Sequence, residues 1–126
     1  MDTGKLRNNT KFYDGYEGEG EITLSLSNDE NISLHIWDGY FEDIFGNPNV
    51  SENGWTGFTK DYQESVRTFA GEETIPSTLI EEYLIDLKCY EKDHFSYDES
   101  SECLALMIDL FKYAHSHSAD IIVNIQ

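Results

Sequence analysis

Several residue types in this chain could carry chemistry, and the first to consider is a glycine-rich stretch near its start. Gly15, Gly18 and Gly20 resemble the beginning of a phosphate-binding loop. A nucleotide loop needs a preceding strand. Here no strand is predicted before the glycines, and acidic residues that would repel phosphate alternate with them. We therefore interpret this stretch as a flexible lead into a strand.

Histidines and cysteines offer the next possible chemistry, which is zinc binding. His115 and His117 are two residues apart, so a helix would point them about 200° away from each other. Cys89 and Cys103 lack the short paired spacing of zinc ligands. The acidic stretch 28–31 likewise lacks the spacing of a calcium loop. We expect buried thiols, helix-end histidines, no metal and no cofactor.

Catalytic patterns are not evident in the sequence. Serine and histidine are present, but no nucleophile elbow or equivalent motif surrounds them. Paired carboxylates are common in any chain with 25 Asp and Glu, so their proximity does not indicate acid–base catalysis. We therefore expect a protein that is not an enzyme.

Aromatic and acidic residues alternate with glycines over residues 38–57, and this pattern is typical of a binding surface. Interfaces use Tyr and Trp as anchors, and acidic groups steer basic partners toward them. The alternative interpretation is that the aromatics belong to the core and the acids form a solvated face. The candidate partner-binding residues are Asp38, Tyr40, Glu42, Asp43, Glu52 and Trp55.

Charge reversal would test this segment. We expect that reversing Asp38, Glu42 and Asp43 together weakens partner binding. The melting temperature should change little, because exposed acids in so negative a chain contribute little favourable energy.

The overall charge restricts which partners are plausible. The chain has 8 Lys and Arg against 25 Asp and Glu, which gives a net charge of −17. That charge repels nucleic-acid phosphates and anionic membrane surfaces. We expect a basic protein partner, no nucleic acid and no membrane.

Hydrophobic periodicity predicts a hairpin ahead of the candidate segment. Apolar and polar residues alternate over 22–27 and again over 32–37, which indicates two strands joined by a turn at residues 28–30. One register places all six apolar residues on a single face; its pairs are Leu26 with Ile32, Leu24 with Leu34, and Ile22 with Ile36.

The middle of the chain is less regular. We expect residues 38–57 to form a partly packed loop and residues 55–59 to form a third strand. A capping box at residues 61–64 favours a short helix over 61–70. A strand remains the alternative there, because residues 66–69 include β-branched and aromatic types.

Two helices and a strand are predicted in the last third. The first helix begins near Pro76 and fades near residue 92, with Asp86 among its outer residues and an inner stripe of Leu79, Ile80, Tyr83, Leu84 and Leu87. The second helix begins at Asp98, and its inner residues are Leu104, Met107, Ile108, Phe111 and Ala114. Residues 120–125 read as a buried strand beside the hairpin.

Together these elements predict a single α+β domain over residues 1–126, in which residues 1–15 form a loose arm or a partial edge strand. An antiparallel sheet built on the hairpin would pack against the helical pair, and the terminal strand would close the sheet. We expect a monomer or weak dimer. The residues after Met1 lack the apolar stretch of a secretory signal, so we expect a cytoplasmic protein.

The small, acidic build resembles the immunity proteins of bacterial contact-dependent growth inhibition and polymorphic toxin systems. The stretches that carry this resemblance are residues 55–58 (WTGF), 79–84 (LIEEYL), 101–104 (SECL) and 120–123 (DIIV). The resemblance implies that the protein binds the toxin domain of the same locus, usually a basic nuclease. Binding would cover the toxin's active site or a nearby surface.

Two other function classes remain open at this point. A nucleic-acid mimic that inhibits a DNA-binding system would need carboxylates in rows. The acids are instead spread evenly, with 13 in residues 1–64 and 12 after them, which argues mildly against a mimic. A small-molecule enzyme would need a pocket that contains perturbed titratable groups.

Overall fold

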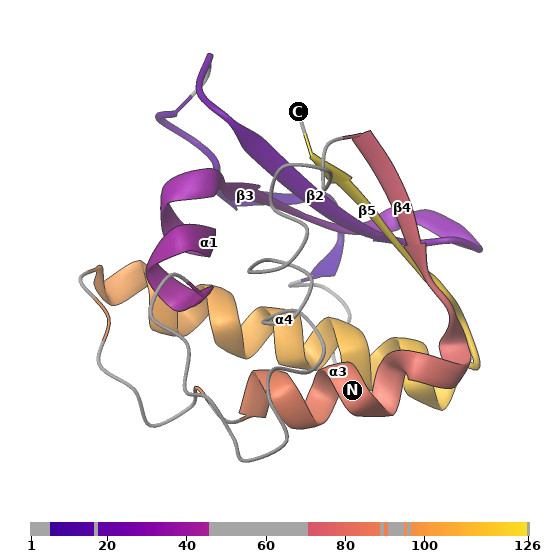
Figure 1. The fold of residues 1–126 in the computed structure, drawn as a ribbon. Helices are drawn as coiled ribbons and strands as arrows, with labels where there is room; N and C mark the ends of the chain where they lie inside the picture. Colours follow the sequence, from indigo (N-terminus) through magenta and orange to yellow (C-terminus); the bar gives the residue numbers. More distant parts are fainter. Residues whose placement is uncertain are drawn as a thin grey trace.

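The computed structural model describes residues 6–16, 18–45, 71–88, 90, 95 and 97–125. Five strands form one sheet in the order β1-β3-β2-β5-β4, and the helices lie on one side of it (Figure 1). The prediction of a mixed α+β fold is therefore confirmed. In chain order the elements are β1 (Asn9–Phe12), β2 (Glu21–Leu26), β3 (Asp29–Trp37), α1 (Asp38–Phe45), β4 (Gly71–Ile75), the 3-10 turn η2 (Ser77–Leu79), α3 (Ile80–Lys88), α4 (Asp98–Ser116) and β5 (Ile121–Ile125).

The hairpin of β2 and β3 has the expected register over most of its length. Ile22 lies opposite Ile36 and Leu24 opposite Leu34, but Leu26 lies opposite Asp29, so the expected pair of Leu26 with Ile32 is wrong. The register shifts after Ser25 because β3 contains extra residues near the turn. An irregularity of this kind lets a strand bend without moving its other side chains off their face. All six apolar side chains of the hairpin are buried.

The expectation of a purely antiparallel sheet is wrong, because β1 runs parallel to β3. Asn9 pairs with Leu34 and Phe12 with Ile36 along this edge. The segment shows no period in the sequence because so few of its side chains reach the core. Leu6 and Phe12 do, and each is only 1% exposed. Of the two interpretations of the first residues, the edge strand is therefore the correct one from Asn9 onward.

Beyond β2, the sheet continues with the closing strand, β5, and then with β4, which was not predicted. β5 pairs antiparallel with β2, as expected for the terminal strand. β4 then pairs antiparallel with β5 and forms the other edge. Its sequence, GEETI, lacks the apolar alternation of a half-buried strand, so periodicity could not reveal it. The expected strand at 55–59, the element at 61–70 and Cys89 lie outside the described residues.

The two C-terminal helices supply much of the core opposite the sheet. All five residues predicted to face inward from α4 are buried. Two placements on the first helix are wrong: Leu79 is 42% exposed, and Asp86 is buried. Leu79 belongs to the 3-10 turn, whose tighter winding takes it off the helical stripe. None of the described helices is long and apolar enough to cross a bilayer.

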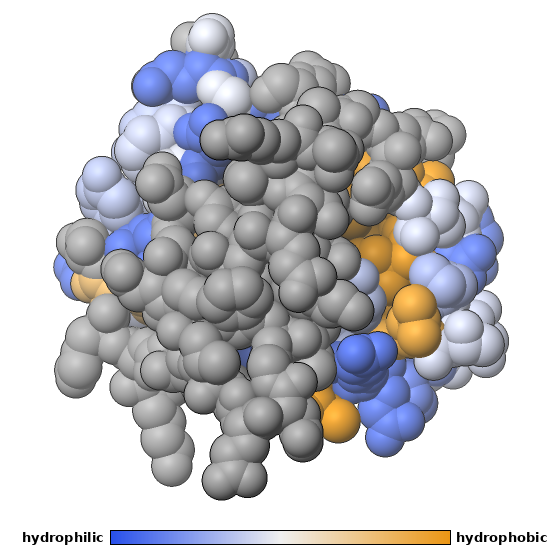
Figure 2. Space-filling view, viewed as in Figure 1, coloured by the Kyte–Doolittle hydropathy of each residue, from blue (hydrophilic) through white to orange (hydrophobic). Residues whose placement is uncertain are grey.

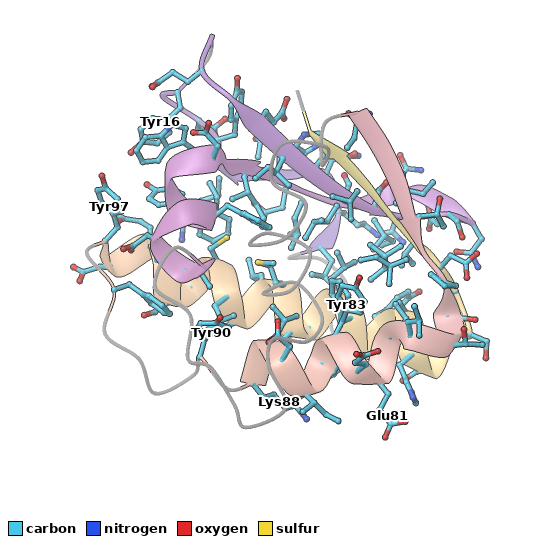
Figure 3. All side chains as sticks on the ribbon, in the orientation of Figure 1. Tyr16, Glu81, Tyr83, Lys88, Tyr90 and Tyr97 are labelled. Atoms are coloured by element: carbon cyan, nitrogen blue, oxygen red, sulfur yellow. The ribbon has the colours of Figure 1, made fainter. Side chains whose placement is uncertain are left out.

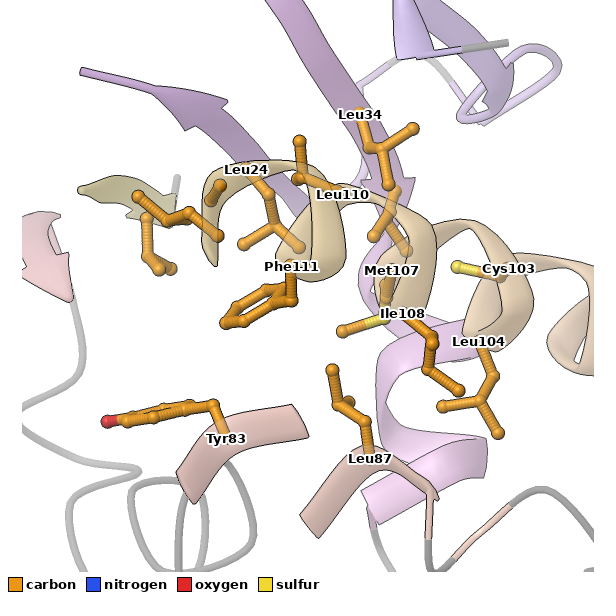
Figure 4. Packing of buried hydrophobic residues seen from close by; sticks show 14 of the residues in the cluster. Leu24, Leu34, Tyr83, Leu87, Cys103, Leu104, Met107, Ile108, Leu110 and Phe111 are labelled. Carbon is orange, nitrogen blue, oxygen red and sulfur yellow. The ribbon is translucent and has the colours of Figure 1, made fainter. Parts of the chain in front are cut away.

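Side chains from the sheet and both helices meet in one cluster (Figure 4). Leu24 and Leu34 reach from the sheet toward α4, where Phe111 is completely buried. The Phe111 ring packs nearly parallel to Tyr83 of α3, with a centroid separation of 6.0 Å. The contact between α3 and α4 therefore continues the core that α4 forms with the sheet.

Truncation of core residues should destabilise the protein strongly. We expect Phe111→Ala to cost about 3–5 kcal/mol and Leu84→Ala about 2–5 kcal/mol, because each leaves a cavity. Ile85→Ala is the matched control, since Ile85 neighbours Leu84 and is 61% exposed; it should change stability by no more than about 0.5 kcal/mol. Urea unfolding measures all three. Equal losses for Leu84 and Ile85 would contradict the assigned helical face.

Candidate functional site

Four aromatic side chains gather where β3 ends and α1 begins, and we call them the aromatic cluster: Tyr16, Trp37, Tyr40 and Tyr97. Tyr16 stacks on Trp37 with ring centroids 4.0 Å apart and planes 5° from parallel. Tyr40 and Tyr97 meet the indole edge-on at 5.1 Å and 5.7 Å. Figure 3 shows Tyr16 and Tyr97 on the same side of the molecule, next to α1.

The strand order explains why Tyr16 covers Trp37. Because β1 and β2 flank β3, the connection between them must cross the end of β3, where Trp37 lies. Gly15 and Gly18 adopt positive φ angles of 93° and 95°, which permit the tight course of this loop. The Tyr13 hydroxyl donates to the Glu19 carbonyl at 2.9 Å and closes the loop across its width. Tyr16 is therefore held over the indole.

The neighbouring rings hold the indole by packing, and Gly39 leaves room for it. A Cβ at Gly39 would overlap the six-membered ring of Trp37, so this position of α1 must lack a side chain. Trp37 Nε1 is buried and finds no acceptor among the described residues. The Tyr16 and Tyr40 hydroxyls lie 3.1 Å apart, and this contact links the stacked Tyr16 ring to the buried Tyr40 ring.

The structure changes the interpretation of residues 38–57, which were expected to form a loop. Their first eight residues form α1, and Tyr40, Phe41 and Ile44 are buried on its inner side. Tyr40, at 5% exposed, therefore does not act as a surface anchor, and for it the core alternative holds. The helix is short and contains a glycine at its second position, which weakens its signal in the sequence.

The predicted acidic residues fall into different environments. Asp38 is exposed at the start of α1, as a binding residue requires. Asp43 is only partly exposed and accepts hydrogen bonds from the Tyr97 backbone N–H at 3.1 Å and from the Ser100 hydroxyl at 2.7 Å. Asp43 thus caps the N-terminus of α4 from a neighbouring helix. The Glu42 side chain, Glu52 and Trp55 lie outside the described residues.

This capping contact corrects the expectation that reversing Asp38, Glu42 and Asp43 together leaves the melting temperature nearly unchanged. A carboxylate near a helix N-terminus stabilises the backbone N–H groups that lack partners within the helix. Reversal at Asp43 would remove both hydrogen bonds and place a positive charge at the positive end of the α4 dipole. The premise that all three acids are exposed is therefore wrong for Asp43.

Sequence reasoning missed Tyr16, Trp37 and Tyr97. Trp37 was placed only as the last residue of a strand, and Tyr97 only precedes a helix start. A possible signal was Trp37 followed at once by Asp38 and Gly39, because a small residue after a bulky ring permits close packing. Tyr97 is 42% exposed, so it is the member of the cluster most available to a partner.

Exposed acids lie within three residues of cluster members in the chain, and we call four of them the acidic rim: Glu19, Asp38, Asp98 and Glu99. Asp38 directly follows Trp37, and Asp98 and Glu99 directly follow Tyr97. Burial raises the pKa of the Tyr40 hydroxyl. The hydrogen bond with Tyr16 and the nearby Glu99 carboxylate raise this pKa further. The charge of Glu99 therefore reaches the Tyr40 ring.

Other hollows in the described part of the chain offer less to a partner or substrate. A depression of about 380 Å³ between β1 and α4 contains an exposed salt bridge of Lys11 with Glu102 at 2.8 Å, which occupies its one lysine, and Asp109 also lines it. The His35 ring lies 2.7 Å from Glu21, with both side chains partly exposed. Among the described residues, no group of three His, Cys, Asp or Glu could hold a metal ion.

Cys103 is a free, fully buried thiol on α4. Desolvation raises its pKa, which disfavours the reactive thiolate. Its environment is that of a core residue.

Comparison of the chain with known protein families, with curated proteins and with solved structures found no match.

Replacement of Asp43 should weaken the protein although it lies at the surface. We expect Asp43→Ala to cost about 1–3 kcal/mol, because it leaves the Tyr97 N–H and the Ser100 hydroxyl without their charged acceptor. Asp38→Ala is the control on the same helix and should cost less than about 1 kcal/mol. Urea unfolding at neutral pH compares the two. Equal losses would mean that the Asp43 contacts contribute no stability.

Alkaline pH should lower the stability of the folded protein through ionisation of the Tyr40 hydroxyl. In the unfolded chain Tyr40 loses its proton near its ordinary pKa of 10.0, whereas the folded state retains it. This contribution to stability is therefore complete below pH 10 and is lost as the pH rises further. Tyr40→Phe removes the titrating group, so its unfolding free energy should fall less steeply between about pH 9 and pH 11. Parallel curves for the two proteins would refute this role.

Proposed function

We propose that this protein is an immunity protein that binds and neutralises a basic toxin domain, of the nuclease kind, in the cytoplasm. The observation that carries the proposal is the aromatic cluster with its acidic rim, in a chain of net charge −17. Large aromatic side chains provide binding energy at interfaces. The surrounding carboxylates attract a positively charged partner and orient it during encounter.

The pre-formed packing of the cluster supports this role. Tyr97 is held through its backbone by Asp43 and through its ring by Trp37 and Tyr40. A side chain that is already ordered loses little entropy when a partner binds, so more of its contact energy becomes affinity. A neutraliser must keep free toxin negligible, which requires a dissociation constant of about 1 nM or lower.

The proposed contact surface differs from the segment expected from the sequence. It keeps Asp38 and replaces Tyr40 by its neighbours Tyr16 and Tyr97, with Tyr40 as a support beneath them. This surface would cover the toxin's active site or a nearby site. The nucleic-acid mimic remains the alternative class and would be favoured if a DNA-binding protein bound in place of the toxin.

Association kinetics test the proposal with matched charge reversals. The double variant Asp98→Lys, Glu99→Lys alters the acidic rim at the first turn of α4. The control, Glu81→Lys, Glu82→Lys, makes the same charge change at the first turn of α3. Both variants lose a similar helix-dipole interaction, so a difference in binding reports the position of the interface.

We expect the α4 variant to slow association with the toxin domain at least about tenfold in stopped-flow measurements at low salt, and the α3 control to slow it much less. The difference should shrink at 0.15 M salt, where the screening length falls to about 8 Å. A larger effect of the α3 control would move the interface to α3. If no candidate toxin domain binds the wild-type protein, the proposed function is wrong.

A further inference from the structure

The aromatic cluster restricts the kind of side chain that it can receive. A cage for a quaternary or methylated ammonium needs space between its rings for the cation. Here the Tyr16 and Trp37 centroids are 4.0 Å apart, and the edge-on contacts of Tyr97 are 5.7 Å and 5.5 Å. These are the distances of rings in direct contact with one another. A cation can therefore reach the cluster only on an outer face.

Tyr97 supplies the most accessible outer face. Tyr97 is 42% exposed, whereas Tyr40 is 5% exposed and Tyr16 and Trp37 are partly buried. The edge-on contacts of Tyr97 with Trp37 and Tyr40 orient its ring and leave part of it exposed. The exposed surface is thus a fixed aromatic platform at the start of α4.

Carboxylates lie next to this platform in the chain. Asp98 and Glu99 follow Tyr97 directly and are exposed on the first turn of α4. A planar guanidinium can stack on an aromatic ring while its N–H groups donate to a carboxylate, whereas an ammonium has no plane to stack. The combination therefore favours arginine over lysine.

We propose that Tyr97 is the receptor for an arginine side chain of the basic partner, with a carboxylate of the acidic rim as the second contact. The inference rests on the proposed function for the identity of the partner. It does not rest on that function for the chemistry of recognition, which peptides can test without any toxin. Tyr16, Trp37 and Tyr40 are positioning residues that hold the platform.

The groove between α3 and α4 gives a useful contrast. Lys88, Lys112 and His115 line it together with one carboxylate, Glu81, around the exposed Ile85. In Figure 2, the coloured side chains at the left edge, beside α1, are mostly hydrophilic, and apolar ones gather at the right near β4 and α3. An arginine-rich partner meets two lysines and one carboxylate at the α3–α4 groove, whereas Asp98 and Glu99 are both acidic beside Tyr97. The charge distribution therefore directs such a partner to the cluster.

Capped hexa-arginine and hexa-lysine peptides provide the test. Both carry the same charge, so the general attraction of an acidic protein affects them equally. We expect hexa-arginine to bind the wild-type protein about two- to fivefold more tightly at 0.15 M salt, as measured by calorimetry. The Tyr97 ring signals should shift in NMR spectra with hexa-arginine and shift much less with hexa-lysine.

Variants of Tyr97 separate stacking from general attraction. Tyr97→Phe should retain the preference for hexa-arginine, and Tyr97→Ala should abolish it. Tyr97→Leu keeps apolar packing without a ring, so it replaces the alanine variant if that variant fails to fold. Tyr113→Ala is the matched control: Tyr113 lies on α4 about 24 Å farther along the helix, and its loss should leave the preference intact.

Each outcome decides a different claim. Equal binding of the two peptides to the wild-type protein, or a preference that survives in Tyr97→Ala and Tyr97→Leu, would overturn the arginine receptor. A preference that depends on Tyr97, together with failure of every toxin domain to bind, would support the receptor and reject the immunity function. Tight toxin binding without a peptide preference would support the immunity function and reject the arginine receptor.

Discussion

The position of β3 between β1 and β2 is the constraint on which the candidate site depends. The chain must cross the end of β3 to pass from β1 to β2, and this crossing places Tyr16 on Trp37. The same strand end begins α1, whose second residue, Gly39, leaves room for the indole. A single strand end therefore determines the loop, the ring stack and the start of a helix. Loosening any one of them would disturb the other two.

Acidic residues in this protein have two separable roles. Asp43 is structural, because its carboxylate joins α1 to the first turn of α4 through Tyr97 and Ser100. Asp38 and Glu99 are exposed and make no such capping bonds in the described part of the chain. Recognition of a basic partner requires the second kind, since a carboxylate already engaged with the protein's own donors has less to offer another molecule. The count of acids alone hides this distinction.

A net charge of −17 also opposes folding, because like charges in a compact state repel one another. The core offsets this cost by burying the apolar face of the sheet against α4, where Leu24, Leu34 and Phe111 are completely buried. An excess of acids that weakens the folded state is understandable if it serves association. In the proposed function, the basic partner neutralises part of that charge and the rings beside it provide the affinity.

The sequence by itself determined the elements whose signal is local and periodic: the apolar face of the hairpin, the inner stripe of α4 and the terminal strand. Alternation and helical spacing reflect burial of one face, so they can be read without knowing what covers it. Only the tertiary structure decided the parallel pairing of β1, the helix at Asp38–Phe45 and the aromatic cluster. These depend on contacts between distant segments, such as Tyr16 with Trp37 and Asp43 with Tyr97. Such contacts leave no periodic trace, because each involves a single residue from each segment.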